Sequence, residues 1–122
     1  MPDFLFSFFL SFFYLHSFPL LQDTIQMKKD LEIYFPVGTS VVKMEEMMKK
    51  NGFSCRMEMN SSFVEESKII KMNRLIEKID YLYCDLEKAK TLFISERWQI
   101  AFVLDEEKKL KEIYVSYGTT GL

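Results

Sequence analysis

Cys55 and Cys84 are the only two cysteines in the sequence, so they are the only pair that could form a disulfide. In an exported protein such a pair predicts a structural bridge, because oxidising compartments preserve it. The bridge would close a loop of about 30 residues and add roughly 3–4 kcal/mol of stability in the chain-entropy model. Two buried free thiols are the alternative. The spacing is not C-x-x-C, which argues against a redox-active pair.

Acidic residues occur in short runs, and they offer the main route to catalysis. Paired carboxylates can hydrolyse glycosides when both face a cleft. Each run here lies in a stretch of mixed charge, which is typical of a solvated surface; the runs are Glu45-Glu46, Glu65-Glu66 and Asp105-Glu106-Glu107. The only histidine, His16, precedes the charged part of the chain, which leaves no Ser-His-Asp or Cys-His set there. We therefore expect no enzyme activity, no metal site and no small-molecule cofactor.

Arginine and aromatic residues are the candidates for contact with another protein. Arg97 and Trp98 are adjacent, and both residue types are frequent anchors of protein interfaces. The alternative is that Trp98 is the core aromatic of a sheet and Arg97 its exposed neighbour. Tyrosines could likewise form an exposed sheet face or simply fill a strand; they are Tyr81, Tyr83, Tyr114 and Tyr117. We take Arg97, Trp98, Tyr81 and Tyr83 as candidate partner-binding residues.

The N-terminal segment has a different composition from the rest. Residues 1–27 contain no lysine or arginine and hold seven of the twelve phenylalanines. Phe4 to Leu21 is a run without a formal charge, close to the length of about 20 residues that spans a bilayer. Its first part, Phe4 to Leu15, also fits the apolar region of a signal peptide. We predict that residues 1–23 are a signal peptide or membrane anchor, with the domain periplasmic or otherwise outside the cytoplasm.

Two other interpretations of this segment stay open. No basic residue precedes the apolar run, and no small-x-small cleavage site occurs near residues 16–24. Lys28 and Lys29 follow the run, and by the positive-inside rule they favour an anchor with a cytoplasmic domain. A buried core helix is the remaining possibility.

Residues 24–122 have the composition of a single globular domain. The whole chain has 16 basic and 18 acidic residues, a net charge of -2. Without Asp3 and Asp23 the charges of the remainder balance, so nothing favours nucleic acid as a partner. The sequence predicts an α+β fold, with one or two helices packed on a three- to four-stranded antiparallel sheet.

Periodicity predicts the elements of this domain. Val41, Met44, Met47 and Met48 share one helical face, with Thr39 or Ser40 as N-cap and Asn51-Gly52 as the stop. Alternation predicts strands over 53–59, 79–84, 91–104 (interrupted at Glu96-Arg97) and 111–117. Connections then fall at 60–62, 86–90 and 105–109, with a flexible tail at 118–122. Before the helix, 22–31 is predicted as a linker and 31–35 as a short extended segment.

The middle of the chain is ambiguous. Ser62 and Glu65 have capping-box spacing, and Ile69, Met72 and Ile76 recur at helical intervals. This pattern predicts a second helix over about 63–77. A long solvated loop with short helical turns is the alternative.

Four stretches resemble small envelope proteins of the SmpA/OmlA (BamE-like) type from Gram-negative bacteria: Phe35-Pro36-Val37-Gly38-Thr39-Ser40, Asn51-Gly52-Phe53-Ser54-Cys55, Tyr81-Leu82-Tyr83-Cys84-Asp85 and Arg97-Trp98-Gln99-Ile100-Ala101-Phe102. The chain looks more like uncharacterised exported proteins that share this module. The resemblance covers 34–59 and 79–121. The sequence departs from the pattern because it has no lipid-accepting cysteine after the leader, an insertion at 60–78, and no glycine in the 105–109 hairpin.

The resemblance implies a small membrane-attached α+β module that binds other proteins or lipids. We therefore expect a non-catalytic, envelope-located protein-binding module, attached to or exported across the membrane through its N-terminal segment. An inhibitor or immunity-type protein that neutralises an enzyme or toxin outside the cytoplasm is the alternative. A small hydrolase is a further one.

Overall fold

The computed structural model describes residues 24–67 and 72–121. Two helices, α3 (Thr24–Tyr34) and α4 (Val41–Lys50), precede four strands in the chain. The strands are β1 (Ser54–Ser67), β2 (Met72–Ala89), β3 (Ile94–Leu104) and β4 (Leu110–Gly121). The prediction for residues 1–23 lies outside the described residues. Neither described helix has the length and apolarity needed to cross a membrane.

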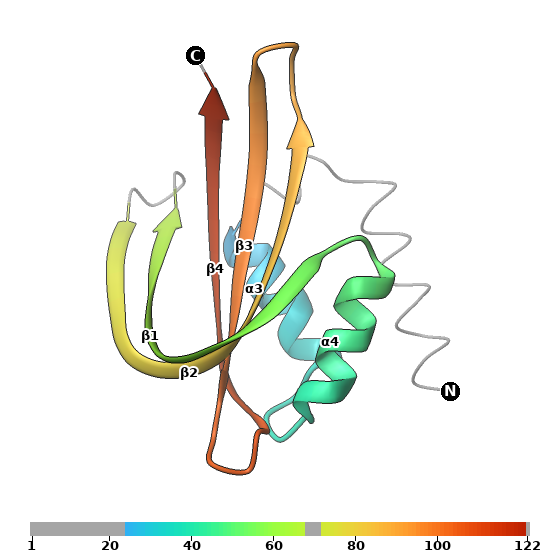
Figure 1. The fold of residues 1–122 in the computed structure, drawn as a ribbon, viewed down its shortest axis with the longest axis vertical. Coiled ribbons are helices and arrows are strands. Elements are labelled where there is room, and N and C mark those ends of the chain that lie inside the picture. Colours follow the sequence, from blue (N-terminus) through green and yellow to red (C-terminus); the bar gives the residue numbers. More distant parts are fainter. Residues whose placement is uncertain (1–23, 68–71, 122) are drawn as a thin grey trace.

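The strands form one antiparallel sheet in the order β1-β2-β3-β4, and both helices lie against one of its faces (Figure 1). This arrangement confirms the predicted α+β class. Phe102 is paired with Leu82 on one side and Ile113 on the other, and all three side chains are buried. Phe35, which follows α3, packs edge-on against Phe102 with ring centroids 5.5 Å apart. The main core therefore lies between the helices and the sheet.

The predicted helix at 41–50 is confirmed as α4. The Ser40 side chain accepts a hydrogen bond from the Lys43 N–H at 3.3 Å, which satisfies one free donor of the first turn. The chain leaves the helix through Asn51 and Gly52, and Gly52 has a φ of 92° that glycine adopts without strain. The buried face consists of methionines: Met44, Met47 and Met48.

α3 occupies the segment predicted as a linker and a short extended piece, so that prediction was wrong. Met27, Leu31 and Phe35 are spaced by four residues, and each is only 1% exposed. This spacing places one narrow apolar stripe against the sheet. The other positions of the helix are mostly polar, which is why the composition looks like that of a linker.

The described parts of the segment 63–77, residues 63–67 and 72–77, are neither a helix nor a solvated loop; they are strands of the long β1–β2 hairpin. Phe63 is paired with Ile76, and Glu65 with Arg74. The predicted loop at 60–62 is a bulged part of β1, where register shifts occur and Asn60 has a φ of 45°. Burial alternates from residue 62 to residue 66, which is the period of a strand.

Beyond the bulge, the hairpin curves away from the helices and turns back toward β4 (Figure 1). The backbone N–H of Glu66 on β1 donates to the Ser116 hydroxyl on β4 at 3.1 Å. The curved hairpin buries a second apolar cluster on the helix-free face: Phe63, Tyr81, Tyr83, Ala101, Val103 and Tyr114. Burial of this cluster stabilises the hairpin, and this tertiary contribution outweighs the helical spacing of the apolar residues in 63–77.

The late strands are longer than predicted. The segment 86–90, predicted as a turn, remains in β2 until Ala89, and the actual turn lies at 90–93, where a strand was predicted. Opposite charges face each other here, because Glu87 is paired with Arg97 and Lys88 with Glu96. The predicted tail is also strand, since β4 continues to Gly121 beside Ile94.

Candidate functional site

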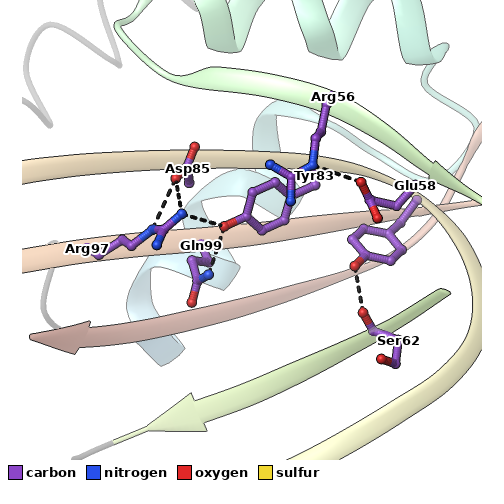
Figure 2. Close-up of polar contacts among 8 residues, drawn as sticks. Arg56, Glu58, Ser62, Tyr83, Asp85, Arg97 and Gln99 are labelled. Carbon is purple, nitrogen blue, oxygen red and sulfur yellow. Dashed lines mark hydrogen bonds and ion pairs between the residues drawn. The ribbon is translucent and has the colours of Figure 1, made fainter. Parts of the chain in front are cut away.

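The helix-free face of the sheet carries a cluster of polar side chains above the strands. The register places Tyr83 between Arg56 on β1 and Ala101 on β3. One step along the same face, Asp85 is paired with Gln99. Figure 2 shows the resulting arginine–tyrosine cluster, which consists of Arg56, Tyr83, Asp85, Arg97 and Gln99.

Arg97 is held by three hydrogen bonds. Its Nε and Nη2 donate to Oδ2 of Asp85 at 3.1 and 2.7 Å, and Nη2 also donates to the Tyr83 hydroxyl at 3.3 Å. Gln99 Nε2 donates to the same hydroxyl at 2.7 Å. The carboxylate of Asp85 raises the pKa of Arg97 above its ordinary value, although partial burial opposes this. The guanidinium is therefore fixed and charged while 39% of the side chain stays exposed.

Arg56 covers the other side of Tyr83. Its guanidinium carbon lies 4.4 Å from the centre of the Tyr83 ring, which is a cation–π geometry. Its Nε donates to Glu58 at 2.8 Å, and this hydrogen bond raises the pKa of Arg56. The Tyr83 ring is consequently buried, whereas 64% of the Arg56 side chain is exposed. The cluster thus presents two oriented guanidinium groups on a rigid aromatic base.

The sequence candidates separate onto two faces. Tyr83 and Arg97 belong to the cluster, and Tyr81 lies next to it, with its hydroxyl donating to the Ser62 carbonyl at 2.6 Å. Trp98 is fully buried on the helix side, with its ring centroid 5.5 Å from that of Tyr117. Trp98 is therefore a core aromatic of the sheet, and Arg97 is its exposed neighbour.

The four tyrosines do not form an exposed face. Each is at most 9% exposed, and Tyr117 belongs to the main core, on the opposite side of the sheet from the other three. The reason is that the β1–β2 hairpin and the arginines cover Tyr81, Tyr83 and Tyr114. Sequence reasoning also missed Arg56, Asp85 and Gln99. For Arg56, the sequence signal was the alternation of 53–59, which placed it on the face opposite Cys55. Asp85 and Gln99 could be assigned to the site only once the strand register was known.

Cys55 and Cys84 form a disulfide, as predicted for an exported protein. They are directly opposite each other on β1 and β2, with 4.1 Å between their Cα atoms. Cys84 is fully buried and lies between Tyr83 and Asp85 in sequence. The bridge therefore fastens the two strands directly behind the cluster. Disulfides of this kind are typical of oxidising, extracytoplasmic compartments.

A buried polar pair lies near the start of β3. Glu96 is 2% exposed, and its carboxylate accepts a hydrogen bond from the Tyr117 hydroxyl at 2.7 Å. Lys90 Nζ lies 3.8 Å from the same carboxylate. Burial, and to a smaller extent Glu96, raise the pKa of Tyr117 from 10.0 to about 12. The hydroxyl therefore stays protonated, and serves as a donor, over the whole physiological pH range.

We expect this pair to produce a loss of stability at alkaline pH. Because the folded-state pKa of Tyr117 is raised, its stabilising contribution is complete below pH 10 and disappears as the pH rises toward about 12. The Tyr117→Phe variant keeps the ring but lacks the titrating hydroxyl, so its stability should fall less steeply over this interval. Urea unfolding of both chains at several pH values from 8 to about 12 measures the difference. Equal slopes of the free energy of unfolding against pH in the two chains would contradict the assignment.

Among residues 24–67 and 72–121, no group of three or more His, Cys, Asp or Glu side chains is placed to hold a metal ion. In the described part of the chain, a cavity of about 160 Å³ opens between the end of α3 and the start of β4, with Phe35, Leu110 and Ile113 in its wall. It is smaller than the usual small-molecule site of roughly 300–1,000 Å³. The arginine–tyrosine cluster is therefore the better candidate site.

Comparison of the chain with family models, curated proteins and solved structures found no match. The resemblance to SmpA/OmlA-type envelope proteins therefore stays a prediction from the four quoted stretches.

Proposed function

We propose that this protein is a non-catalytic binding module of the cell envelope that holds another protein through its arginine–tyrosine cluster. The observation that carries the proposal is the ordered pair of half-exposed guanidinium groups on Arg56 and Arg97. Residues 1–23 would export the domain or attach it to the membrane.

Arginine and tyrosine are common anchors of protein interfaces, because each combines a large contact area with directional hydrogen bonding. An anchor that is already ordered loses less conformational entropy on binding. The hydrogen bonds from Arg97 to Asp85 and Tyr83 supply this order in the free protein.

The charge of the site favours a protein surface over a polyanion. Arg56 and Arg97 are each accompanied by a carboxylate, from Glu58 and Asp85 respectively. The local charges therefore cancel, whereas nucleic-acid sites carry a clear basic excess. A partner of mixed polarity, with carboxylates or carbonyl oxygens placed to accept from the guanidinium edges, fits this site.

The location outside the cytoplasm is supported by two independent features. One is the Cys55–Cys84 disulfide, which an oxidising compartment would preserve. The other is the uncharged run from Phe4 to Leu21, which has the composition of an export signal or anchor.

We expect Arg97→Ala to weaken partner binding by about tenfold or more, the usual effect of removing an interface anchor. A photo-crosslinking residue at Ser54, which is exposed and paired with Asp85, would report contact at the cluster in the native cells. The same probe at Glu106, in the 105–109 turn, is the position control. Arg74→Ala is the matched control, because Arg74 is also a half-exposed arginine paired with a carboxylate, but it lies on the curved hairpin.

Arg97→Lys should not restore binding, since lysine keeps the charge and loses the planar fork. Adducts at Ser54 that persist in Arg97→Ala, or that decline equally in Arg74→Ala, would contradict the role of the cluster. Recovery of the chain from its cells with two free thiols would contradict the extracytoplasmic location.

A further inference from the structure

The turn between β2 and β3 presents two adjacent apolar side chains to the solvent. Leu92 is 88% exposed and Phe93 is 64% exposed. The turn is closed by its own hydrogen bonds: Lys90 N–H donates to the Ile94 carbonyl at 2.8 Å, and the N–H groups of Phe93 and Ile94 donate to Thr91 Oγ1 at 3.3 and 3.1 Å. The backbone N–H groups of Lys90, Thr91, Phe93 and Ile94 thus donate within the turn, while the side chains of Leu92 and Phe93 extend into the solvent.

The tip has the chemistry of a contact with a membrane interface. An aromatic and an aliphatic residue stand side by side, and they are preceded by Lys88 near the end of β2 and by Lys90 in the turn. Phenylalanine and leucine are typical of protein surfaces that enter the headgroup–acyl boundary, and lysines favour anionic headgroups. Two protruding residues offer far less area than the roughly 800 Å² per partner of a stable protein interface. A lipid surface, which requires no shape complementarity, is the better match.

The N-terminal end of α3 points toward the same end of the molecule. The chain after α3 is hydrogen-bonded to the start of β4, from Gly38 N–H to the Leu110 carbonyl. Further back along α3, Lys28 Nζ lies 5.4 Å from the centre of the Tyr114 ring. The helix therefore runs antiparallel to β4, and its N-terminal end is directed toward the end of the sheet that carries the β2–β3 turn (Figure 1). The uncharged run from Phe4 to Leu21 joins the domain at this helix end.

We propose that Leu92 and Phe93 insert into the headgroup–acyl boundary of the membrane in which residues 4–21 are anchored. The proposal rests on the membrane attachment in the proposed function and adds a second, independent point of contact. The β2–β3 turn and residues 4–21 can contact the same bilayer when β3 is tilted so that the end at this turn faces the membrane. Two points of attachment restrict the rotation of the domain, so the arginine–tyrosine cluster would face its partner in a defined orientation.

The test uses the full chain reconstituted into vesicles of phosphatidylethanolamine and phosphatidylglycerol, with tryptophan as a depth probe. Phe93→Trp places the probe at the tip. Val37→Trp is the matched control, because Val37 is 80% exposed and lies in the turn between α3 and α4, beside the start of β4 and at the other end of β3. Trp98 is buried and common to all chains, so its emission in the unsubstituted protein is subtracted.

We expect the emission of Phe93→Trp to shift to the blue on reconstitution, and brominated lipids to quench it several-fold more than that of Val37→Trp. Equal, weak quenching of both probes in chains that float with the vesicles would overturn the tip contact and leave membrane attachment intact. Failure of the chain to float with the vesicles would overturn both. A blue shift that lipid quenchers do not affect would place the tip against protein, either a second copy or the chain's own N-terminal segment, and would also overturn the proposal.

Discussion

Replacement of both Cys55 and Cys84 by alanine is expected to lower the free energy of unfolding by about 3–4 kcal/mol. The bridge joins residues 29 apart in sequence and closes a loop that contains most of the β1–β2 hairpin. Without it the unfolded chain gains the conformational freedom of that loop. A domain of this size has only about 5–15 kcal/mol of stability in total, so the loss would be a large fraction of it.

Alanine is the better substitute here, because Cys84 is fully buried and a serine hydroxyl would require a new hydrogen-bond partner. Urea unfolding of the isolated protein measures the effect, and chemical reduction of the unsubstituted chain is the control for the substitutions themselves. The two treatments should agree within about 1 kcal/mol. A loss below about 1 kcal/mol in both experiments would mean that the unfolded chain keeps residual pairing between β1 and β2. The hairpin would then be restricted even without the bridge.

Phe102→Ala should cost about 3–5 kcal/mol, the usual range for emptying a phenylalanine site in a core. Phe102 is fully buried at the centre of the sheet, between Leu82 and Ile113, and contacts Phe35 of the helical layer. Its removal therefore opens a cavity where strands and helices meet. Few atoms can move in to fill it, since the neighbouring backbone is fixed by pairing on both sides.

The chain offers an internal control for this substitution. Phe93→Ala removes the same atoms from a side chain that is 64% exposed, and it should change the stability of the lipid-free domain by about 0.5 kcal/mol or less. Thermal unfolding of both variants under identical conditions provides the comparison. Similar losses in the two variants would contradict the assignment of Phe102 to the core and of Phe93 to the surface.

The sequence by itself determined the elements whose periodic pattern agrees with their burial. In α4, a polar cap, an apolar face of methionines and an Asn51-Gly52 stop indicate the same helix and the same ends. In β3, Trp98, Ile100 and Phe102 alternate with more polar neighbours and are buried together. The α+β class follows from these elements, and the expectation of export combined with an even cysteine count predicted the disulfide.

Local pattern was insufficient where a segment is stabilised by distant parts of the chain. The segment 63–77 has helical spacing, yet residues 63–67 pair with residues 72–76, because the curved hairpin buries the tyrosines on this face of the sheet. α3 buries a single apolar residue per turn, while its other apolar residues Ile25 and Ile33 are exposed, so only contact with the sheet identifies its buried face.

The candidate site shows the same division. The residue types Arg97 and Tyr83 could be selected from composition and adjacency, whereas Asp85, Gln99 and Arg56 join them only through the pairing of three strands. Register is a property of the folded sheet, and a shift of one residue would move every one of these side chains to the opposite face. Trp98 illustrates the consequence, since it adjoins Arg97 in sequence and lies on the other side of the sheet. Sequence determined which residues could serve as anchors; the tertiary structure decided which of them share a surface.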